Sequence, residues 1–394
     1  MMKKILIGFI STVLLLVPVA ALDAGGYAVT GFGFQAPIKV PDLPFTLKNY
    51  EGLGFYLRQN MDTEGNYNFN FDASYLFSVS MNFKNGLQKP VPLSHIVDVN
   101  QCDFSFFFPT ENGSTELQLG RFNDSDYTKI IFKQKIDGIK VAVDYRGLVL
   151  NFLFGYTGLL NTYTNPSAVQ PKKYSNKLYS LAPAFVVANL DSAVPIGNYG
   201  HKLGFAFLSF TQAKKDPSYQ FFITTYVNGQ IITRLLFDIS GTLGIRKFGT
   251  SPSQYNSLFI TKLAYYFPQY QSVLGFKCLY ASGSNEAQNR AAFMGFTKSP
   301  LSKVSRQLPS DIVDLGLYAS VKPLDNLIIK MYADNYLKAS KPQTKKERYQ
   351  GFEWGAALNY GIRQNIYINA DIGQLISHKG EGSFLGELSL ILTF

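Results

Sequence analysis

The chain offers few residues of the kinds that carry out covalent chemistry. Its three histidines, His95, His201 and His378, lie far apart in the sequence, and none has a serine or a second metal ligand at the spacing that a catalytic or metal site needs. Its two cysteines, Cys102 and Cys278, are too few for a disulfide scaffold. We therefore predict no enzymatic activity, no cofactor and no metal, and we expect both thiols to be free.

The charged residues indicate another kind of chemistry, the sorting of solutes by charge. Lys277 and Lys330, for example, each lie between two apolar neighbours. In a β-strand this alternation places charged and apolar side chains on opposite faces. Either these charges select solutes, or they only solvate an enclosed space and pair across strands. The residues that we predict to line this space are Lys140, Asp144, Arg234, Asp238, Lys277, Lys330, Asp334, Glu353, Asp371 and Glu387.

Period-two alternation recurs along almost the whole chain. Over residues 67–83 every odd position is apolar or aromatic, and the even positions are polar except Leu76. A soluble sandwich needs its apolar faces to meet in one core, and strands of roughly ten residues repeated this often exceed what one sandwich uses. A barrel in lipid turns its apolar face outward and its polar face inward. The predicted fold is an all-β, transmembrane, antiparallel β-barrel.

The N-terminus has the pattern of a secretory signal peptide. Two lysines precede the apolar run 5–19, and two alanines follow it. We predict cleavage after Ala21, which makes residues 1–21 the signal peptide and residues 22–394 a single outer-membrane barrel. No later apolar run approaches the length that a spanning helix needs.

The C-terminal segment 383–394 alternates and ends on Phe394. It resembles the last strand of bacterial outer-membrane barrels, whose terminal aromatic residue is read by the barrel assembly machinery. We place this end at the side of the short turns and work backward. The result is about 18 strands, with 16 as an alternative, and the first strand at 27–34. Barrels of this size leave a lumen.

Turn residues divide the connections into two sets, short at one end of the barrel and long at the other. Segments 191–200 and 211–217 depart from this rule, since the first is long for its end and the second is short. The predicted short turns are 109–113, 146–147, 228–229, 268–271, 323–326 and 361–365. The predicted long connections are 84–101, 123–136, 157–177, 248–255, 282–311 and 338–351.

Positive charge gathers in two of the long connections, and the net charge of the chain is +10. These residues either form a funnel that concentrates anionic solutes or contact anionic surface glycolipid and water. Nucleic acid is a poor partner for them, because no binding fold accompanies the charge. The residues are Arg290, Lys298, Lys303 and Arg306 in one connection, and Lys338, Lys341, Lys345, Lys346 and Arg348 in the other.

The connection 282–311 is longer than a rim loop needs and carries an apolar stretch with Phe293, Met294 and Phe296. Leaving this stretch in water is unfavourable by roughly 25 cal/mol per Å² of apolar area. It must pack in the barrel interior, where it would constrict the channel, or on a neighbouring protomer. We favour the interior, because Gly283 and Gly295 allow tight bends and the basic residues beside the stretch could then reach lumen carboxylates.

Several short motifs carry a family resemblance. They are Leu-Gly-Arg at 119–121 followed by Asp-Gly at 137–138, Leu-Tyr-Ala-Ser-Gly at 279–283, and Lys-Pro-Leu-Asp-Asn at 322–326. With them the chain resembles outer-membrane porins, and its C-terminal half is similar to alginate-export-type channels. This resemblance implies an 18-stranded barrel with a basic lumen that passes anionic sugars. Ser284 departs from the pattern, since an acidic residue is expected there.

The sequence therefore predicts a porin of the outer membrane of a diderm bacterium, through which small hydrophilic solutes, including anionic ones, diffuse. The partners that follow are outer-membrane lipid, the barrel assembly machinery and the solutes, while monomer and trimer both stay open. One alternative is a fatty-acid-transporter type of carrier for hydrophobic compounds, which would suit the aromatic content but lacks an Asn-Pro-Ala signature. Another is a structural or adhesive surface barrel.

Overall fold

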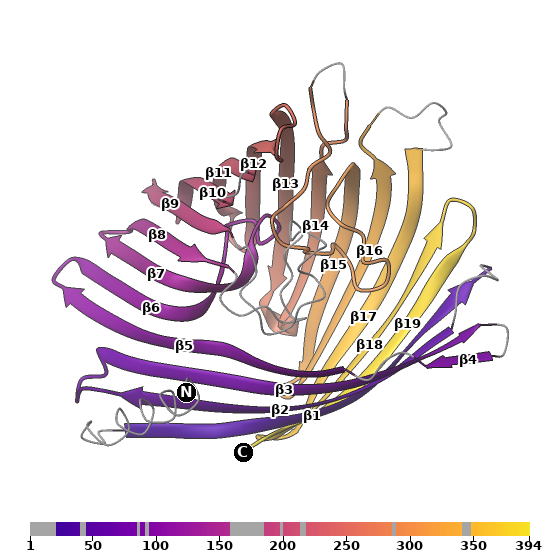
Figure 1. The fold of residues 1–394 in the computed structure, drawn as a ribbon, viewed down its shortest axis with the longest axis horizontal. Helices are drawn as coiled ribbons and strands as arrows, with labels where there is room; N and C mark the ends of the chain where they lie inside the picture. The colour runs from indigo at the N-terminus through magenta and orange to yellow at the C-terminus, as the bar shows by residue number, and fades with distance from the viewer. Residues whose placement is uncertain are drawn as a thin grey trace.

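A computed structural model shows one continuous antiparallel sheet, described here for residues 21–39, 45–84, 87–90, 94–157, 185–197, 200–212, 218–285, 289–340 and 348–394 (Figure 1). The predicted signal peptide lies outside these residues apart from Ala21. The first strands are β1 (Ala21–Ile38), β2 (Phe45–Asn60), β3 (Tyr67–Lys84), β4 (Leu87–Pro90), β5 (Ser94–Thr110), β6 (Gly113–Ser125), β7 (Lys133–Tyr145), β8 (Leu148–Tyr156), β9 (Val186–Ile196) and β10 (His201–Gln212). The others are β11 (Ser218–Ile232), β12 (Leu235–Lys247), β13 (Gln254–Phe267), β14 (Ser272–Ala281), β15 (Ile312–Leu324), β16 (Leu327–Lys338), β17 (Tyr349–Arg363), β18 (Ile366–Ser377) and β19 (Gly382–Thr393).

The sheet closes on itself, because β1 pairs with β2 on one side and with β19 on the other. At the closure, the backbone N–H of Gly26 donates to the carbonyl of Phe394 over 2.7 Å, and the N–H of Phe394 donates to Gly26 over 3.0 Å. The short β4 and the long β5 follow one another along β3, so they share one position in the wall. The barrel thus has 18 strand positions, which confirms the preferred prediction over 16.

The short turns lie at one end of the barrel, together with both ends of the strand ladder, as predicted. Most predicted turns are correct, but the Asn-Gly pair at 228–229 is not a hairpin turn. Asn228 and Gly229 lie within β11, opposite Asp238 and Phe237, and the chain turns only at 233–234. The physical reason is that the outer-face alternation continues past Gly229 through exposed Ile231, so extending the ladder overrides the local turn preference.

Further boundaries differ from the prediction. The predicted connection 84–101 is too long, because β5 already begins at Ser94. Segment 191–200 is mostly strand, because β9 continues to Ile196 and pairs with β10 throughout. The turn there is therefore short, and this exception to the turn-length rule disappears. The first strand extends well beyond 27–34 at both ends. Segment 213–217 and most of the predicted connection 157–177 lie outside the described residues.

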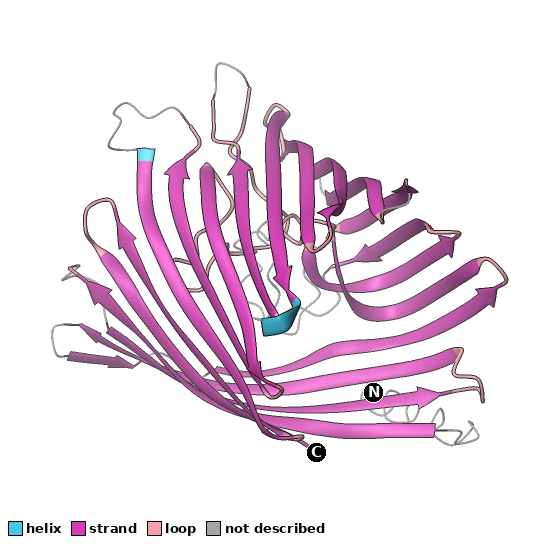
Figure 2. Cartoon of the chain, turned by 180° about the vertical axis from the view of Figure 1, so that it is seen from behind, coloured by secondary structure: helices cyan, strands magenta, loops and turns pink. Residues whose placement is uncertain are grey.

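The outer surface of the barrel is apolar, as the alternation predicted. Ile139 of β7, Leu243 of β12 and Leu317 of β15 are exposed large hydrophobic residues at outward positions. Cys102 and Cys278 are both free thiols, as predicted, and Cys102 is exposed. The described ribbon consists of strands, the loops that join them, and short helical turns such as Pro268–Tyr270 (Figure 2). Among the described residues, no helix is long and apolar enough to cross a membrane.

A hydrophobic core lies inside the barrel toward the long loops. It contains Phe210 of β10 and Phe222 of β11, which face inward, and Phe132, Phe293 and Phe296 of two connections that fold into the lumen. All five side chains are buried. The barrel is therefore packed on one side of its upper lumen.

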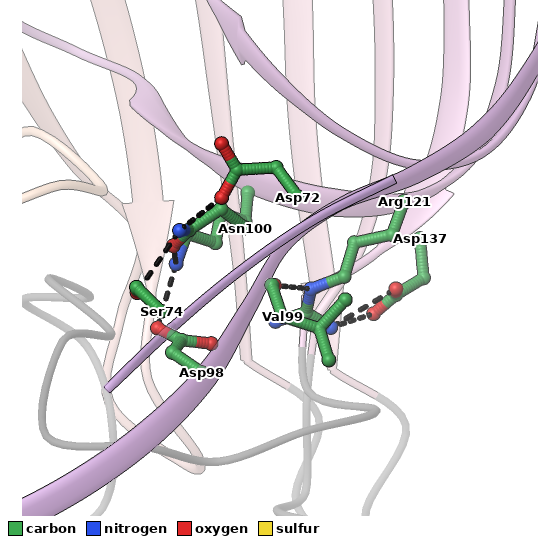
Figure 3. A network of polar contacts seen from close by, with 8 residues as sticks. Asp72, Ser74, Asp98, Val99, Asn100, Arg121 and Asp137 are labelled. Atoms are coloured by element: carbon green, nitrogen blue, oxygen red, sulfur yellow. Dashed lines mark hydrogen bonds and ion pairs between the residues drawn. The ribbon is translucent and has the colours of Figure 1, made fainter. Parts of the chain in front are cut away.

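The backbone ladder between β5 and β6 covers only part of the length of these two strands. Their ladder runs from Thr110–Gly113 to Cys102–Arg121; beyond it β5 continues along β3, β6 continues along β7, and the two strands separate (Figure 1). Side chains bridge the separation. Arg121 donates through Nε to the carbonyl of Val99 over 2.8 Å (Figure 3). Lys135 donates to Asp98 over 2.6 Å and to Asn100 over 2.7 Å. We call this set of contacts the β5–β6 seam.

Candidate functional site

The inward faces of β14 to β19 enclose a cavity of about 970 Å³ in the lumen. Each strand contributes alternate residues to it, while its other residues face outward. Residues of the segment 300–306, in the connection between β14 and β15, also line the cavity. The charged and tyrosine residues that line the cavity are Tyr50, Lys277, Lys303, Arg306, Tyr318, Lys330, Tyr332, Asp334, Asp371 and Glu387.

Lys277 is the centre of a charge cluster in the cavity wall. Its Nζ atom lies 3.0 Å from a carboxylate oxygen of Asp314 and 3.0 Å from one of Asp334, and both acids are buried. Gly316 makes room for the cluster, because a Cβ atom there would collide with both Lys277 and Asp334. With two carboxylates on one ammonium group, Lys277 adds no positive charge to the cavity.

Glu353 of β17 anchors the interior connection. It is 0% exposed, and its carboxylate accepts hydrogen bonds from Ser302 Oγ (2.7 Å), the backbone N–H of Ser305 (3.1 Å) and that of Val304 (3.3 Å). Tyr332 donates to the same carboxylate over 3.0 Å. A carboxylate buried in this way is stabilised by its donors. Glu353 was predicted to line the pore, but it lies beneath the loop and holds it instead.

Lys303 extends from the same connection to Asp371 of β18, with 2.6 Å between Nζ and the carboxylate. This agrees with the expectation that a basic residue of the connection would reach a lumen carboxylate. Three charged residues of the cavity make no ion pair with any other described residue: Lys330, Arg306 and Glu387. Lys330 and Arg306 are both exposed. Among the described charged residues of the cavity, the cations without an ion-pair partner therefore outnumber the acid without one, Glu387.

A second polar cluster lies across the lumen. Tyr127, from the connection between β6 and β7, stacks on Tyr226 of β11 with ring centroids 3.5 Å apart. Its hydroxyl donates to Asp238 over 2.8 Å and accepts from Asn228 over 2.8 Å. Tyr226 in turn donates to Asp191 over 2.9 Å. Residues 126–132 are therefore fixed inside the barrel.

The first residue of that connection, Asp126, is an internal cap. Its two carboxylate oxygens accept from the backbone N–H groups of Thr128 (2.8 Å) and Phe132 (2.7 Å). Burial raises the pKa of Asp126 to about 6, although these hydrogen bonds oppose the shift. Burial likewise raises the pKa of the Tyr127 hydroxyl, with a further contribution from Asp238.

The predicted pore-lining residues divide into four groups. Five of them share the cavity: Lys277, Lys330, Asp334, Asp371 and Glu387. Lys140 pairs with Asp124 over 3.0 Å, and Asp238 belongs to the tyrosine cluster. Glu353 is buried. Asp144 and Arg234 lie at the short turns, where Asp144 accepts from Gly147 and Arg234 has a φ of 76°, so the predicted place of Arg234 on a strand is wrong.

The predicted constriction residues lie in the interior. Phe293 and Phe296 are fully buried in the hydrophobic core, and Met294 is half-buried. Gly295 acts by close approach rather than by a special φ, because a Cβ atom there would collide with the backbone carbonyl of Ile130. This contact lets the two interior connections meet: the N–H of Thr297 donates to the carbonyl of Ile131 over 3.0 Å.

Sequence reasoning missed the partners that make these clusters. Asp314 has the inward parity that identified its neighbours, so the same rule could have found it. Tyr127 and Tyr226 are brought together only by the fold, and no spacing signals their stacking. Among the described residues, no group of three or more His, Cys, Asp or Glu side chains could hold a metal ion.

Comparison with protein-family models and with curated proteins gives no match for this chain. Solved structures from Pseudomonas aeruginosa share its fold. OccK9 (OpdG) has a TM-score of 0.63 at 10% identity and aligns over 95% of this chain and 99% of its own. OccK5 (OpdH) has a TM-score of 0.60 at 13% identity, over 94% and 98%. OccK11 (OpdR) has a TM-score of 0.59 at 14% identity, over 95% and 96%. At these identities the likeness shows the barrel fold.

Proposed function

We propose that the chain is an outer-membrane channel of a diderm bacterium, through which small hydrophilic solutes, including anionic ones, pass by diffusion. The observation that carries the proposal is the cavity of about 970 Å³, lined by charged and tyrosine side chains inside a barrel with an apolar outer surface. A polar lumen behind an apolar outer wall suits a water-filled path through lipid. The fold shared with the Pseudomonas barrels gives further support.

Residues 300–306 take up part of the lumen at the cavity, because Glu353 of β17 and Asp371 of β18 hold them against the wall. We infer that selection depends on the two cations without ion-pair partners there, Lys330 and Arg306, rather than on Lys277. A solute with one negative charge would meet these donors in the same cavity as Tyr50 and Tyr318, which can hydrogen-bond to its hydroxyl groups. Glu387 would disfavour solutes with several negative charges.

The finer part of the proposal concerns the class of solute. The resemblance of the C-terminal half to alginate-export-type channels implies anionic sugars, and the cavity lies on strands of that half. Its mixed charge favours a single acidic sugar over a polyanionic chain, because paired acids such as Asp371 leave little net positive charge. Small monocarboxylate sugars are therefore the first solutes to test.

Neither of the other predicted functions gains a specific observation. A carrier for hydrophobic compounds needs exposed apolar surface in its lumen. Three phenylalanine side chains of the described interior connections, Phe132, Phe293 and Phe296, are instead buried.

Planar-bilayer recording tests the proposal. The purified barrel should form stable channels whose reversal potential in a salt gradient indicates anion preference. Adding a monocarboxylate sugar should reduce the chloride current reversibly, while its neutral alcohol analogue should not. A folded, inserted barrel that conducts no ions would contradict the proposal.

A further inference from the structure

The outer face of β1 and β2 carries a polar patch in an apolar surface. Thr30, Asn49 and Glu51 are all exposed at outward positions, and Thr30 lies directly opposite Glu51 in the ladder. We call these three residues the outer polar patch. Large apolar side chains surround it on the same face: Phe32 is 49% exposed, Leu53 58% and Phe55 49%.

The patch lies between two rows of outward aromatic rings. The upper row is nearer the long connections, and the lower row is nearer the short turns. In the upper row, Phe34 and Phe83 flank Phe45 of β2, with ring centroids 6.3 Å and 6.2 Å from it. In the lower row, Phe69 lies opposite Gln59 of β2 and packs on Phe104 at 5.0 Å. Rows of this kind mark the two interfaces of the lipid bilayer around a barrel.

Glu51 follows Phe45 by six residues and precedes Gln59 by eight. With a rise of about 3.3 Å per residue and a strand tilt of about 40°, it lies roughly 15 Å below the upper row and roughly 20 Å above the lower one. Its carboxylate is therefore within the apolar band. Another outward acid, Asp137, pairs with Arg121 over 3.0 Å, whereas the carboxylate of Glu51 makes no ion pair or hydrogen bond with a described residue.

A carboxyl group that faces lipid tails is unfavourable, because nothing there replaces its hydration. Anionic glycolipid is not a suitable partner, since its phosphates would be repelled by Glu51. A second protein surface that offers hydrogen-bond donors at the same depth would remove the penalty. The surface itself offers such a donor in the hydroxyl of Thr30.

A two-fold axis along the membrane normal leaves the depth of every residue unchanged. Thr30 and Glu51 lie at nearly the same depth on neighbouring strands, so this rotation brings Thr30 of one copy to Glu51 of the other, and the reverse. The contact is self-complementary, as a two-fold interface requires. Phe32, Leu53 and Phe55 would then pack on their counterparts.

We propose that the outer polar patch is the centre of a two-fold symmetric dimer of this chain in the outer membrane. In the dimer, the Thr30 hydroxyl of each copy donates a hydrogen bond to Glu51 of its partner. Asn49 adds a second donor at the edge of the contact. This inference rests on the proposed outer-membrane location of the barrel.

Cysteine cross-linking in native outer membranes tests the interface. In a background with Cys102→Ser and Cys278→Ser, Leu53→Cys leaves Thr30 and Glu51 intact and should give a disulfide-linked dimer as the main product after oxidation, because Leu53 packs on its own counterpart in the dimer. The matched control is Leu243→Cys on β12, an outward residue that is 71% exposed on another part of the wall. It should give only collisional dimer. Equal yields from the two variants would overturn the proposal.

A second measurement separates a dimer from other assemblies and from misfolding. Light scattering in mild detergent should give twice the mass of one chain for the parent protein, and a trimer mass or a monomer mass would each overturn the dimer. Glu51→Leu with Thr30→Val should raise the dimer dissociation constant by about tenfold or more, because each copy loses a hydrogen bond to a charged group. Glu51→Gln should retain most of the dimer.

Heat-dependent gel mobility and channel conductance, recorded on the same samples, report folding and membrane function. If the barrel conducts but stays monomeric, the dimer is wrong and the channel proposal stands. If it forms the dimer but does not conduct, the channel proposal is wrong and the interface stands.

Discussion

The ring of Phe210 in β10 stacks face to face on the ring of Phe296, with centroids 4.0 Å apart and planes 2° apart. One ring belongs to the barrel wall and the other to the connection between β14 and β15. This contact, with the bonds of Glu353, fixes the connection inside the lumen. It therefore determines how much of the upper lumen stays open.

Removing this anchor should widen the channel. Deletion of residues 291–296 is expected to raise single-channel conductance, because it removes the apolar part of the interior connection. Phe296→Ala alone should destabilise the packed connection by about 3–5 kcal/mol and cause frequent transitions to a larger conductance. Phe205→Ala, on the outer face of β10, is the matched control and should leave conductance unchanged. A conductance that does not change in the deletion variant would show that the connection does not narrow the path.

The charge preference of the channel should depend on the unpaired cations. Lys330→Glu is expected to lower the anion-over-cation permeability ratio several-fold, and Arg306→Glu should act in the same direction. Reversal potentials in a salt gradient measure the ratio. Lys322→Glu is the control, because Lys322 pairs with Asp325 at the rim. If the control shifts the ratio as much as Lys330→Glu, selection takes place at the rim and not in the cavity.

Lys277 should matter for stability more than for selectivity. Lys277→Met leaves Asp314 and Asp334 buried without their shared cation, which is expected to cost about 3–5 kcal/mol. The temperature at which the folded gel band disappears should fall accordingly. The triple variant with Asp314→Asn and Asp334→Asn should recover part of the loss. A Lys277→Met barrel as stable as the parent would show that the acids are hydrated in solution.

The connection at residues 126–132 should loosen as pH rises. Because the pKa of Asp126 is raised to about 6 from 3.8, the packed form binds a proton more tightly than the open form. Protonation of Asp126 therefore stabilises the packed form relative to the open form. This stabilisation is fully present below pH 3.8, the pKa in the open form, and it is lost as pH rises through about 6. The opening equilibrium should increase on the order of 100-fold over this range. Hydrogen exchange of the Thr128 and Phe132 amides, corrected for intrinsic rates, measures this opening equilibrium. Asp126→Asn should abolish its dependence on pH.

The β5–β6 seam should be a weak point of the wall. Lys135→Met removes the donor to buried Asp98 and to Asn100, and we expect a loss of about 3 kcal/mol. Lys133→Met, an exposed residue two positions away, is the matched control. Protease cleavage near residues 94–101 in membranes should increase in the first variant alone. Equal cleavage in both would mean that the bridging contacts contribute little.

The fold could be predicted from sequence because outer and inner faces follow a strict period of two. The same parity identified Lys277, Lys330, Asp334, Asp371 and Glu387, which meet in one cavity. It could not say which of them are neutralised, since Asp314 and Lys277 meet only through the register of β14 and β15. Nor could it distinguish lining from anchoring, so the role of Glu353 was wrong.

Local turn signals were less dependable than the alternation. Asn-Gly at 228–229 is a strong hairpin signal, yet Asn228 is needed in β11 as a donor to Tyr127. That contact joins residues far apart in the sequence, and neither composition nor spacing indicates it. The interior place of Phe293 and Phe296 could be predicted, because apolar area in a long polar connection has few other places to pack.

The bonds between Gly26 and Phe394 have a consequence for how the molecule forms. Every other neighbouring pair of strands is close in sequence, but this pair joins the two ends of the ladder. The entropy lost in bringing such distant residues together is compensated only when the intervening strands are already paired. Closure should therefore be the final step of folding, and an unclosed intermediate would present β1 and β19 as two free edges. Assembly thus needs protection for these edges until the ends of the chain meet.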